Sequence, residues 1–146
     1  MTLELLKLTD LYAIPVLFIA GSIFHFIYKW SEYNNWVLIF GAINESIWEH
    51  MKIAFWPMLI WAMIQYVIFR DVLPSNFVLA KATSLLLITL SIPALVYAYT
   101  RILRKFIFPI DLSLFLITIA ISQYASFYVM ENSWDHLIEH LSLIPI

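Results

Sequence analysis

The chain has 146 residues and a net charge of -2 at neutral pH; 63% of its residues are hydrophobic and only 12% are charged. Its mean hydropathy is +0.87. A soluble fold is excluded because too few polar residues remain to cover its surface, and the composition is typical of one domain that crosses a membrane several times. The small net charge argues against nucleic acid as a partner. The absence of cysteine excludes disulfides, thiolate metal sites and cysteine nucleophiles.

Four apolar stretches are long enough to cross the hydrocarbon core, which needs about 20 residues of helix. They are residues 11–30, 52–69, 77–100 and 110–130. Backbone groups in lipid must be satisfied internally, which leaves helices or closed barrels, and apolar runs of this length exclude a barrel. We therefore predict an all-α transmembrane bundle of four spans, in contact with the lipid bilayer and formed by residues 1–146 as one integral membrane domain.

Two further segments are expected to be helical without crossing the membrane. Residues 35–51 are too polar in their second half to face lipid, so we predict a polar helix that lies at the interface, enters the bilayer as a half-helix, or extends the second span. Residues 131–146 are expected to form a short amphipathic helix. This tail contains His136, Glu139 and His140 in an H-x-x-E-H pattern, but zinc proteases of that type need a further ligand downstream, so a solvated helix is preferred.

The lysines and arginines give a weak indication of orientation. The side that holds the first and third loops carries Lys29, Lys52, Arg101, Arg104 and Lys105, and the opposite side carries Lys7, Arg70 and Lys81. By the positive-inside rule the first side is cytoplasmic.

One polar segment interrupts the apolar sequence: Asn44-Glu45-Ser46-Ile47-Trp48-Glu49-His50-Met51-Lys52. A charge at the bilayer centre costs roughly 2.5–3.5 kcal/mol on insertion scales, so such residues are rare and usually functional. On a helix, Glu45 and Glu49 share one face. His25 and Tyr28 lie on one stripe of the first span, which a short loop joins to this segment. We expect His25, Tyr28, Glu45 and Glu49 to meet, and they are the candidate catalytic residues.

The remaining polar residues near this segment are expected to form a structural network. Its members are Asn44, His50, Lys52 and Asp111. Lys52 lies one turn after Glu49 and is available to neutralise a carboxylate. Asp111 follows Pro109 at the start of the fourth span, where an N-cap is the preferred role and a place in a polar cavity is the alternative.

Three blocks of the sequence carry a resemblance. They are His25-Phe26-x-Tyr28-x-Trp30-Ser31, then Asn44-Glu45-Ser46-x-Trp48-Glu49-His50-x-Lys52, then Phe55-Trp56-Pro57. The chain resembles a family of small, uncharacterised multi-pass bacterial membrane proteins with a domain of unknown function, most densely over residues 20–60. The resemblance implies an integral protein of the bacterial cytoplasmic (inner) membrane and supplies no activity. Members of that family continue into a further hydrophobic helix, so this chain is expected to be a short version or incomplete.

Three interpretations of the polar residues remain open. The preferred one is a structural or accessory membrane protein in which Glu45, Glu49 and Lys52 form a buried ion-pair network. A second is a membrane-embedded enzyme in which His25, Glu45 and Glu49 hold a divalent metal, since nitrogen and oxygen ligands suit hard or borderline ions. A third is a small proton- or cation-coupled transporter, for which four spans are few unless the chain forms a homo-oligomer.

The metal interpretation makes a direct prediction. Detergent-purified protein, stripped and reloaded, should bind about one metal ion per chain, and a His25→Ala variant should lose it. Elemental analysis measures both. A parent protein that retains no metal contradicts the metal site and leaves proton handling or a structural role.

Overall fold

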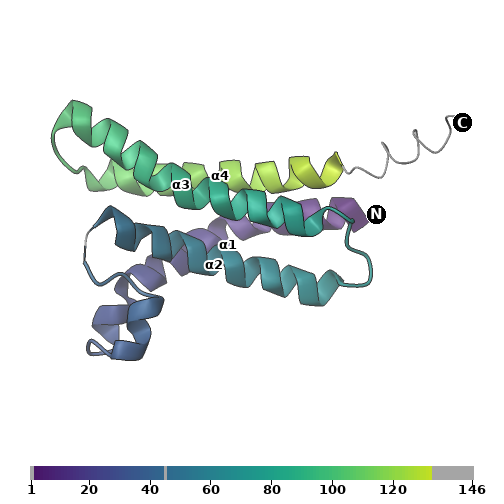
Figure 1. Cartoon of the computed structure of the whole chain (residues 1–146), viewed down its shortest axis with the longest axis horizontal. Helices are drawn as coiled ribbons and strands as arrows, with labels where there is room; N and C mark the ends of the chain where they lie inside the picture. The colour runs from purple at the N-terminus through teal and green to yellow at the C-terminus, as the bar shows by residue number, and fades with distance from the viewer. Residues whose placement is uncertain (1, 45, 133–146) are drawn as a thin grey trace, which may run out of the picture.

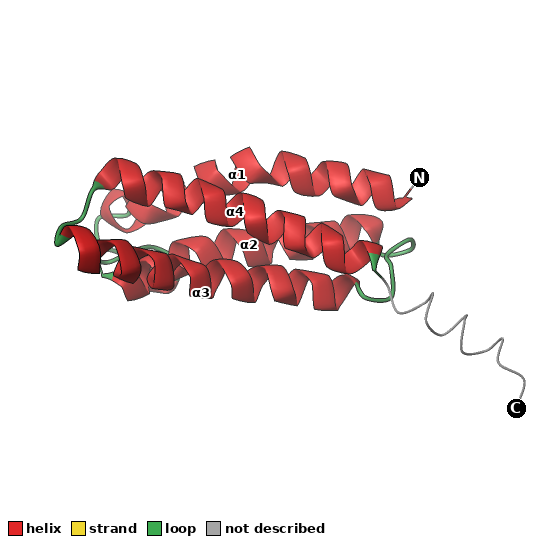
Figure 2. Ribbon diagram, turned by 90° about the horizontal axis from the view of Figure 1, so that it is seen from above, coloured by secondary structure: helices red, strands yellow, loops and turns green. Residues whose placement is uncertain are grey.

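The protein is an antiparallel four-helix bundle in the computed structural model, which describes residues 2–44 and 46–132. The long helices are α1 (Thr2–Trp30), α2 (Ile47–Phe69), α3 (Phe77–Leu103) and α4 (Phe108–Glu131), and a short 3-10 helix, η1 (Asn35–Ile39), follows α1. The described part of the chain contains no strand. The start of α1 and the α2–α3 turn lie at one end of the bundle, and η1 and the α3–α4 turn lie at the other (Figures 1 and 2).

All four long helices are long and apolar enough to cross a membrane, which indicates an integral membrane protein. Large apolar side chains are exposed on every one of them; Ile19, Ile60, Leu86 and Ile121 are examples. Such continuous apolar surface is expected where a protein meets lipid. The prediction of an all-α fold with four long apolar helices is therefore confirmed, although α1 begins nine residues before the predicted residue 11 (11 − 2 = 9) and α2 begins at Ile47 instead of residue 52.

The predicted polar helix over residues 35–51 is not observed. Its first part is the 3-10 helix η1, the described residues between Ile39 and Ser46 are not helical, and its last part is the first turn of α2. The cap at Ser46 explains the break, because Ser46 is extended and its side chain accepts a hydrogen bond from the Glu49 amide; Asn34 caps the start of η1 by accepting one from the Trp36 amide. A capping residue fixes a helix start, so the chain cannot continue as one helix through Ser46.

A glycine holds the loop after η1 against α1. A Cβ atom added at Gly41 would lie 2.7 Å from Cγ2 of Ile27 and 3.2 Å from the carbonyl oxygen of Phe24. The next amide, that of Ala42, donates to the same Phe24 carbonyl at 3.3 Å. Only glycine permits so close an approach, and the loop at Gly41 and Ala42 is thereby held against the end of α1. The expected amphipathic tail helix lies outside the described residues, apart from Glu131 and Asn132.

An apolar cluster fills the middle of the bundle and receives side chains from all four long helices. Its buried members are Ala13, Leu17, Ala54, Met58, Ile88, Ile92 and Ile119. Close packing of this kind gives the helices a fixed arrangement. It also divides the interior into two ends, each of which contains polar residues.

A buried ion pair joins three helices on the side of the cluster where α1 begins. The ammonium of Lys81 donates to both carboxylate oxygens of Asp10, at 2.6 and 2.8 Å, and the amide of Gln65 donates to Asp10 at 2.7 Å and to the Thr9 hydroxyl at 2.9 Å. The exposed fractions of Asp10, Lys81 and Gln65 are 2%, 7% and 1%. Asp10 lies outside the first span predicted from the sequence (residues 11–30), and Lys81 was predicted there only as an indicator of orientation.

Removal of one partner of this pair should strongly destabilise the folded protein. Lys81→Met leaves the Asp10 carboxylate buried without its cation, and we expect a loss of about 3–5 kcal/mol, whereas the double variant Asp10→Leu/Lys81→Met should recover most of it. Thermal unfolding in detergent measures the difference. The control is Arg70→Met, because Arg70 pairs with Asp71 at 3.4 Å in an exposed position and should cost less than about 1 kcal/mol. If Lys81→Met is tolerated as well as the control, the pair does not stabilise the bundle.

Candidate functional site

The charged residues of the polar segment clamp the loop after η1 to the start of α2. Glu49 pairs with Lys52 at 2.6 Å, and the same carboxylate oxygen of Glu49 accepts a hydrogen bond from the Ile43 amide at 3.0 Å. The ammonium of Lys52 also donates to the carbonyl of Leu38 at 2.7 Å. One turn on, the indole of Trp56 donates to the Ile39 carbonyl at 2.7 Å. These side chains satisfy backbone groups at the end of η1 and in the loop that follows it, which is a structural role.

The two histidines of the described region lie next to each other. The rings of His25, on α1, and His50, in the first turn of α2, have centroids 5.3 Å apart. Nδ1 of His50 lies 2.8 Å from the carbonyl oxygen of Ser46. A carbonyl can only accept, so Nδ1 carries the proton, and Nε2 is the basic nitrogen of the neutral ring.

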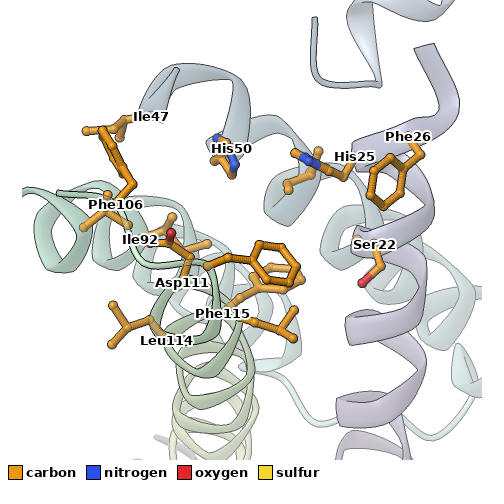
Figure 3. A pocket seen from close by; sticks show the side chains of 15 residues that line it. Ser22, His25, Phe26, Ile47, His50, Ile92, Phe106, Asp111, Leu114 and Phe115 are labelled. Carbon is orange, nitrogen blue, oxygen red and sulfur yellow. The ribbon is translucent and has the colours of Figure 1, made fainter. Parts of the chain in front are cut away.

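Both histidines line a cavity of about 420 Å³ at the end of the bundle where α1 ends. Side chains from all four long helices and from the α3–α4 turn form its walls (Figure 3). The walls are apolar except for four residues. The polar ones are Ser22, His25, His50 and Asp111, and the apolar ones include Phe26, Ile53, Val96, Phe106, Phe108 and Phe115. Figure 3 shows the imidazoles side by side on one wall, with Asp111 and Phe115 across from them.

The carboxylate of Asp111 is held by a tyrosine. The hydroxyl of Tyr99, on α3, donates to Asp111 and accepts a hydrogen bond from the Ile107 amide at 3.3 Å. The N-cap of α4 is Ile107, so the preferred N-cap role for Asp111 is wrong; the helix start contains Pro109, and Asp111 lies in the first turn. Asp111 lines the cavity, whose walls are otherwise largely apolar, and the alternative of a polar cavity stays a prediction.

The predicted site residues therefore lie in different parts of the structure. His25, His50 and Asp111 line the cavity, while Glu49 and Lys52 form the loop clamp. Two others have local roles: the Tyr28 ring packs against Tyr33 with centroids 5.3 Å apart, and the Asn44 side chain accepts from the Ser46 amide at 2.9 Å. Glu45 lies outside the described residues.

The predicted metal site stays a prediction. Among residues 2–44 and 46–132, no three His, Asp or Glu side chains lie close enough to hold a metal ion. The proposed ligand set of His25, Glu45 and Glu49 includes one residue that falls outside these ranges. In the described part, Glu49 is already engaged with Lys52 and the Ile43 amide.

Sequence reasoning missed the cavity itself and most of its wall. Ser22 was visible on the same stripe as His25, three residues earlier, and Tyr99 was visible as an aromatic residue near a helix end. The sequence did not indicate that Phe106, Phe108 and Phe115 line the cavity, because phenylalanine is abundant throughout the chain. Their placement depends on how α4 packs against α1 and α3.

Comparison with known protein families assigns the chain to a group. Residues 4–146 match a family of unknown function, DUF6512. The chain belongs to this family. No curated protein and no solved structure matches it. The DUF6512 assignment agrees with the resemblance to a family without an assigned activity, and the function of this DUF6512 chain therefore has to be argued from the cavity and the polar interior.

The loop clamp can be tested by removal of its cation. Lys52→Met should cost about 1.5–3 kcal/mol, because the bonds to the Glu49 carboxylate and to the Leu38 carbonyl are both lost and the carboxylate is stranded. Thermal unfolding in detergent measures the cost, and proteolysis between η1 and α2 should accelerate in parallel. Lys29→Met, at an exposed position on the same end of the bundle, is the control. Equal behaviour of the two variants would contradict the clamp.

Proposed function

We propose that this protein is an accessory membrane protein that binds a small amphipathic molecule in the cavity between its four helices. Binding pockets for small molecules are concave, largely apolar and about 300–1,000 Å³ in volume, with a few polar groups that fix the orientation of the ligand. The cavity of about 420 Å³, apolar except for Ser22, His25, His50 and Asp111, has these features, and it is the observation that carries the proposal.

The distribution of polar groups suggests how such a ligand is oriented. His25, His50 and Asp111 come from the ends of α1, α2 and α4, near the connecting loops, whereas Ile92 of the cavity wall is itself a member of the apolar cluster. A polar headgroup is accommodated beside the imidazoles and the carboxylate, and a hydrocarbon portion packs among the phenylalanine, isoleucine and valine side chains. A ligand of this kind is available from the bilayer that surrounds the helices.

The proposal also covers the membrane in which the protein resides, its orientation there and its oligomeric state. The protein resides in the bacterial cytoplasmic membrane with the cavity end toward the cytoplasm, because that end carries Lys29, Arg101, Arg104 and Lys105 as exposed cations. Its exposed apolar surface contacts lipid and is available for a homo-oligomer. The Glu49–Lys52 pair supports the structural side of the proposal, because both partners are used to hold backbone groups between Leu38 and Ile43.

A bulkier residue in the cavity should reduce ligand binding. The probe is a phospholipid that carries a photoreactive diazirine in one acyl chain, and cross-linking yield is measured by mass spectrometry. Ser22→Leu should lower the yield roughly tenfold, equivalent to about 1.4 kcal/mol, because the added carbons occupy the cavity. Peptide mapping of the cross-linked parent should identify cavity residues.

Ser113→Leu is the matched control. Ser113 is exposed on α4 outside the cavity, and like Ser22 its hydroxyl donates to a carbonyl of its own helix, at 2.7 Å compared with 2.8 Å. This variant should cross-link like the parent. Cross-links confined to the outer surface, or equal yields from Ser22→Leu and the parent, would contradict the proposed site.

A further inference from the structure

A second polar region crosses the interior on the opposite side of the apolar cluster from the cavity. Buried polar side chains from all four long helices contribute to it. We call it the polar layer, and its members are Asp10 on α1, Gln65 on α2, Lys81 and Ser84 on α3, and Gln123 and Ser126 on α4. All six are buried.

Contacts between the helices place these residues at similar depth. Gln65 and Lys81 both donate to Asp10, which fixes α2 and α3 relative to α1. The ammonium of Lys7 lies 4.6 Å from the centre of the Phe127 ring, so the start of α1 is level with the end of α4. The two helices are antiparallel, and Asp10 therefore lies close to the level of Gln123, one turn before Phe127.

The inner edge of the layer is marked by a methionine. The Met58 sulfur, on α2, accepts a hydrogen bond from the Gln123 amide at 3.5 Å and one from the Ser84 hydroxyl at 3.9 Å. Met58 is itself a member of the apolar cluster. The layer thus extends from the Asp10–Lys81 pair to the boundary of the cluster, which separates it from the cavity.

Three oxygen atoms of the layer lack hydrogen-bond partners within the described part of the chain. They are Oε1 of Gln65, Oε1 of Gln123 and Oγ of Ser126, and all three are buried. Nearby hydroxyls on the same helix do not share this property: Ser122 donates to the Ile119 carbonyl at 2.8 Å, and Thr118 donates to its own helix in the same way. Buried polar atoms are almost always paired with protein groups or with water, so each exception needs an explanation.

We propose that the polar layer is an internal binding site for water molecules, which bond the three oxygens and connect them to the Asp10–Lys81 pair. Internal waters typically make about three hydrogen bonds to buried polar groups that are otherwise unsatisfied. Gln65 is the bridging residue, because both protons of its amide are used by Thr9 and Asp10 while its carbonyl oxygen is buried without a partner in the described part of the chain. The site does not depend on the function of the cavity.

A hydrated layer of this kind gives protons a path into the membrane interior. Ionisable residues inside a membrane, hydrogen-bonded to one another and to water, are the elements of proton relays. In each transfer a water oxygen gives one proton to its neighbour and receives another, so the charges of Asp10 and Lys81 are unchanged at the end. The apolar cluster seals the layer from the cavity, and exchange is therefore restricted to the side where α1 begins.

The sign of a stability change tests whether water is bound. Ser126→Ala removes a hydroxyl that is unsatisfied in a dry interior but hydrogen-bonded in a hydrated one. If the layer holds water, Ser126→Ala lowers the Tm in detergent, as Ser122→Ala does; the two serines lie on the same helix and are both 0% exposed. If the layer is dry, removal of the unpaired hydroxyl raises the Tm, and that outcome overturns the proposal. Gln123→Met, which keeps the shape of the side chain, should likewise lower the Tm.

A second measurement detects the water directly. In isotope-labelled protein in detergent, NMR should show transfer of magnetisation from water to the side-chain amide protons of Gln123. The methyl groups of Ile119, in the apolar cluster and equally buried, are the control and should show none. The transfer to Gln123 should diminish in Ser126→Ala, because one of the groups that hold the water is lost. Absence of transfer in the parent overturns the proposal whatever the cavity binds.

Discussion

Polar groups inside an apolar helix bundle must find their partners within the protein, and this constraint accounts for most of the specific contacts described above. An unpaired donor, acceptor or charge in lipid or in a packed interior is far more costly than one in water. The Asp10–Lys81 pair with its Gln65 donor, the Glu49–Lys52 clamp and the Tyr99–Asp111 bond are three solutions to the same requirement. Each joins parts of two different elements or loops and so fixes their relative positions.

The interior is organised in three regions along the bundle. The cavity with its histidines lies at the end where α1 finishes, the apolar cluster fills the middle, and the polar layer lies where α1 begins. The apolar cluster thus lies between the cavity and the polar layer.

The loop between α1 and α2 has an architectural purpose beyond connection. Glu49, Lys52 and Trp56 all bind backbone atoms of the segment from Leu38 to Ile43. A loop held in this way positions Ser46 as the cap of α2, and the cap in turn sets where His50 begins its turn of helix. Glu49 and Lys52 thus help to position His50, which lines the cavity.

The four long helices could be predicted from the sequence because the pattern that identifies each of them lies within one continuous segment. A run of about 20 apolar residues predicts a helix wherever it occurs, since the backbone has no other way to satisfy its hydrogen bonds in lipid. The loop that replaced the predicted polar helix was harder to foresee. Its caps are visible as Asn34 and Ser46, but their effect depends on the approach of Gly41 to α1 and on side-chain bonds from α2.

The sequence by itself determined the class of protein and the number of long apolar helices, and it marked His25 as a site candidate and His50 and Asp111 as members of a structural polar network. Only the tertiary structure decided which of them share a cavity, that Glu49 and Lys52 serve a loop, and that Asp10, Gln65 and Lys81 form one buried group. The physical reason is that a polar residue in an apolar span indicates that it needs a hydrogen-bonding or charged partner, but it does not indicate which residue that partner is. The partner's identity follows from the rotation and depth of each helix against its neighbours, which are set by packing across the whole bundle.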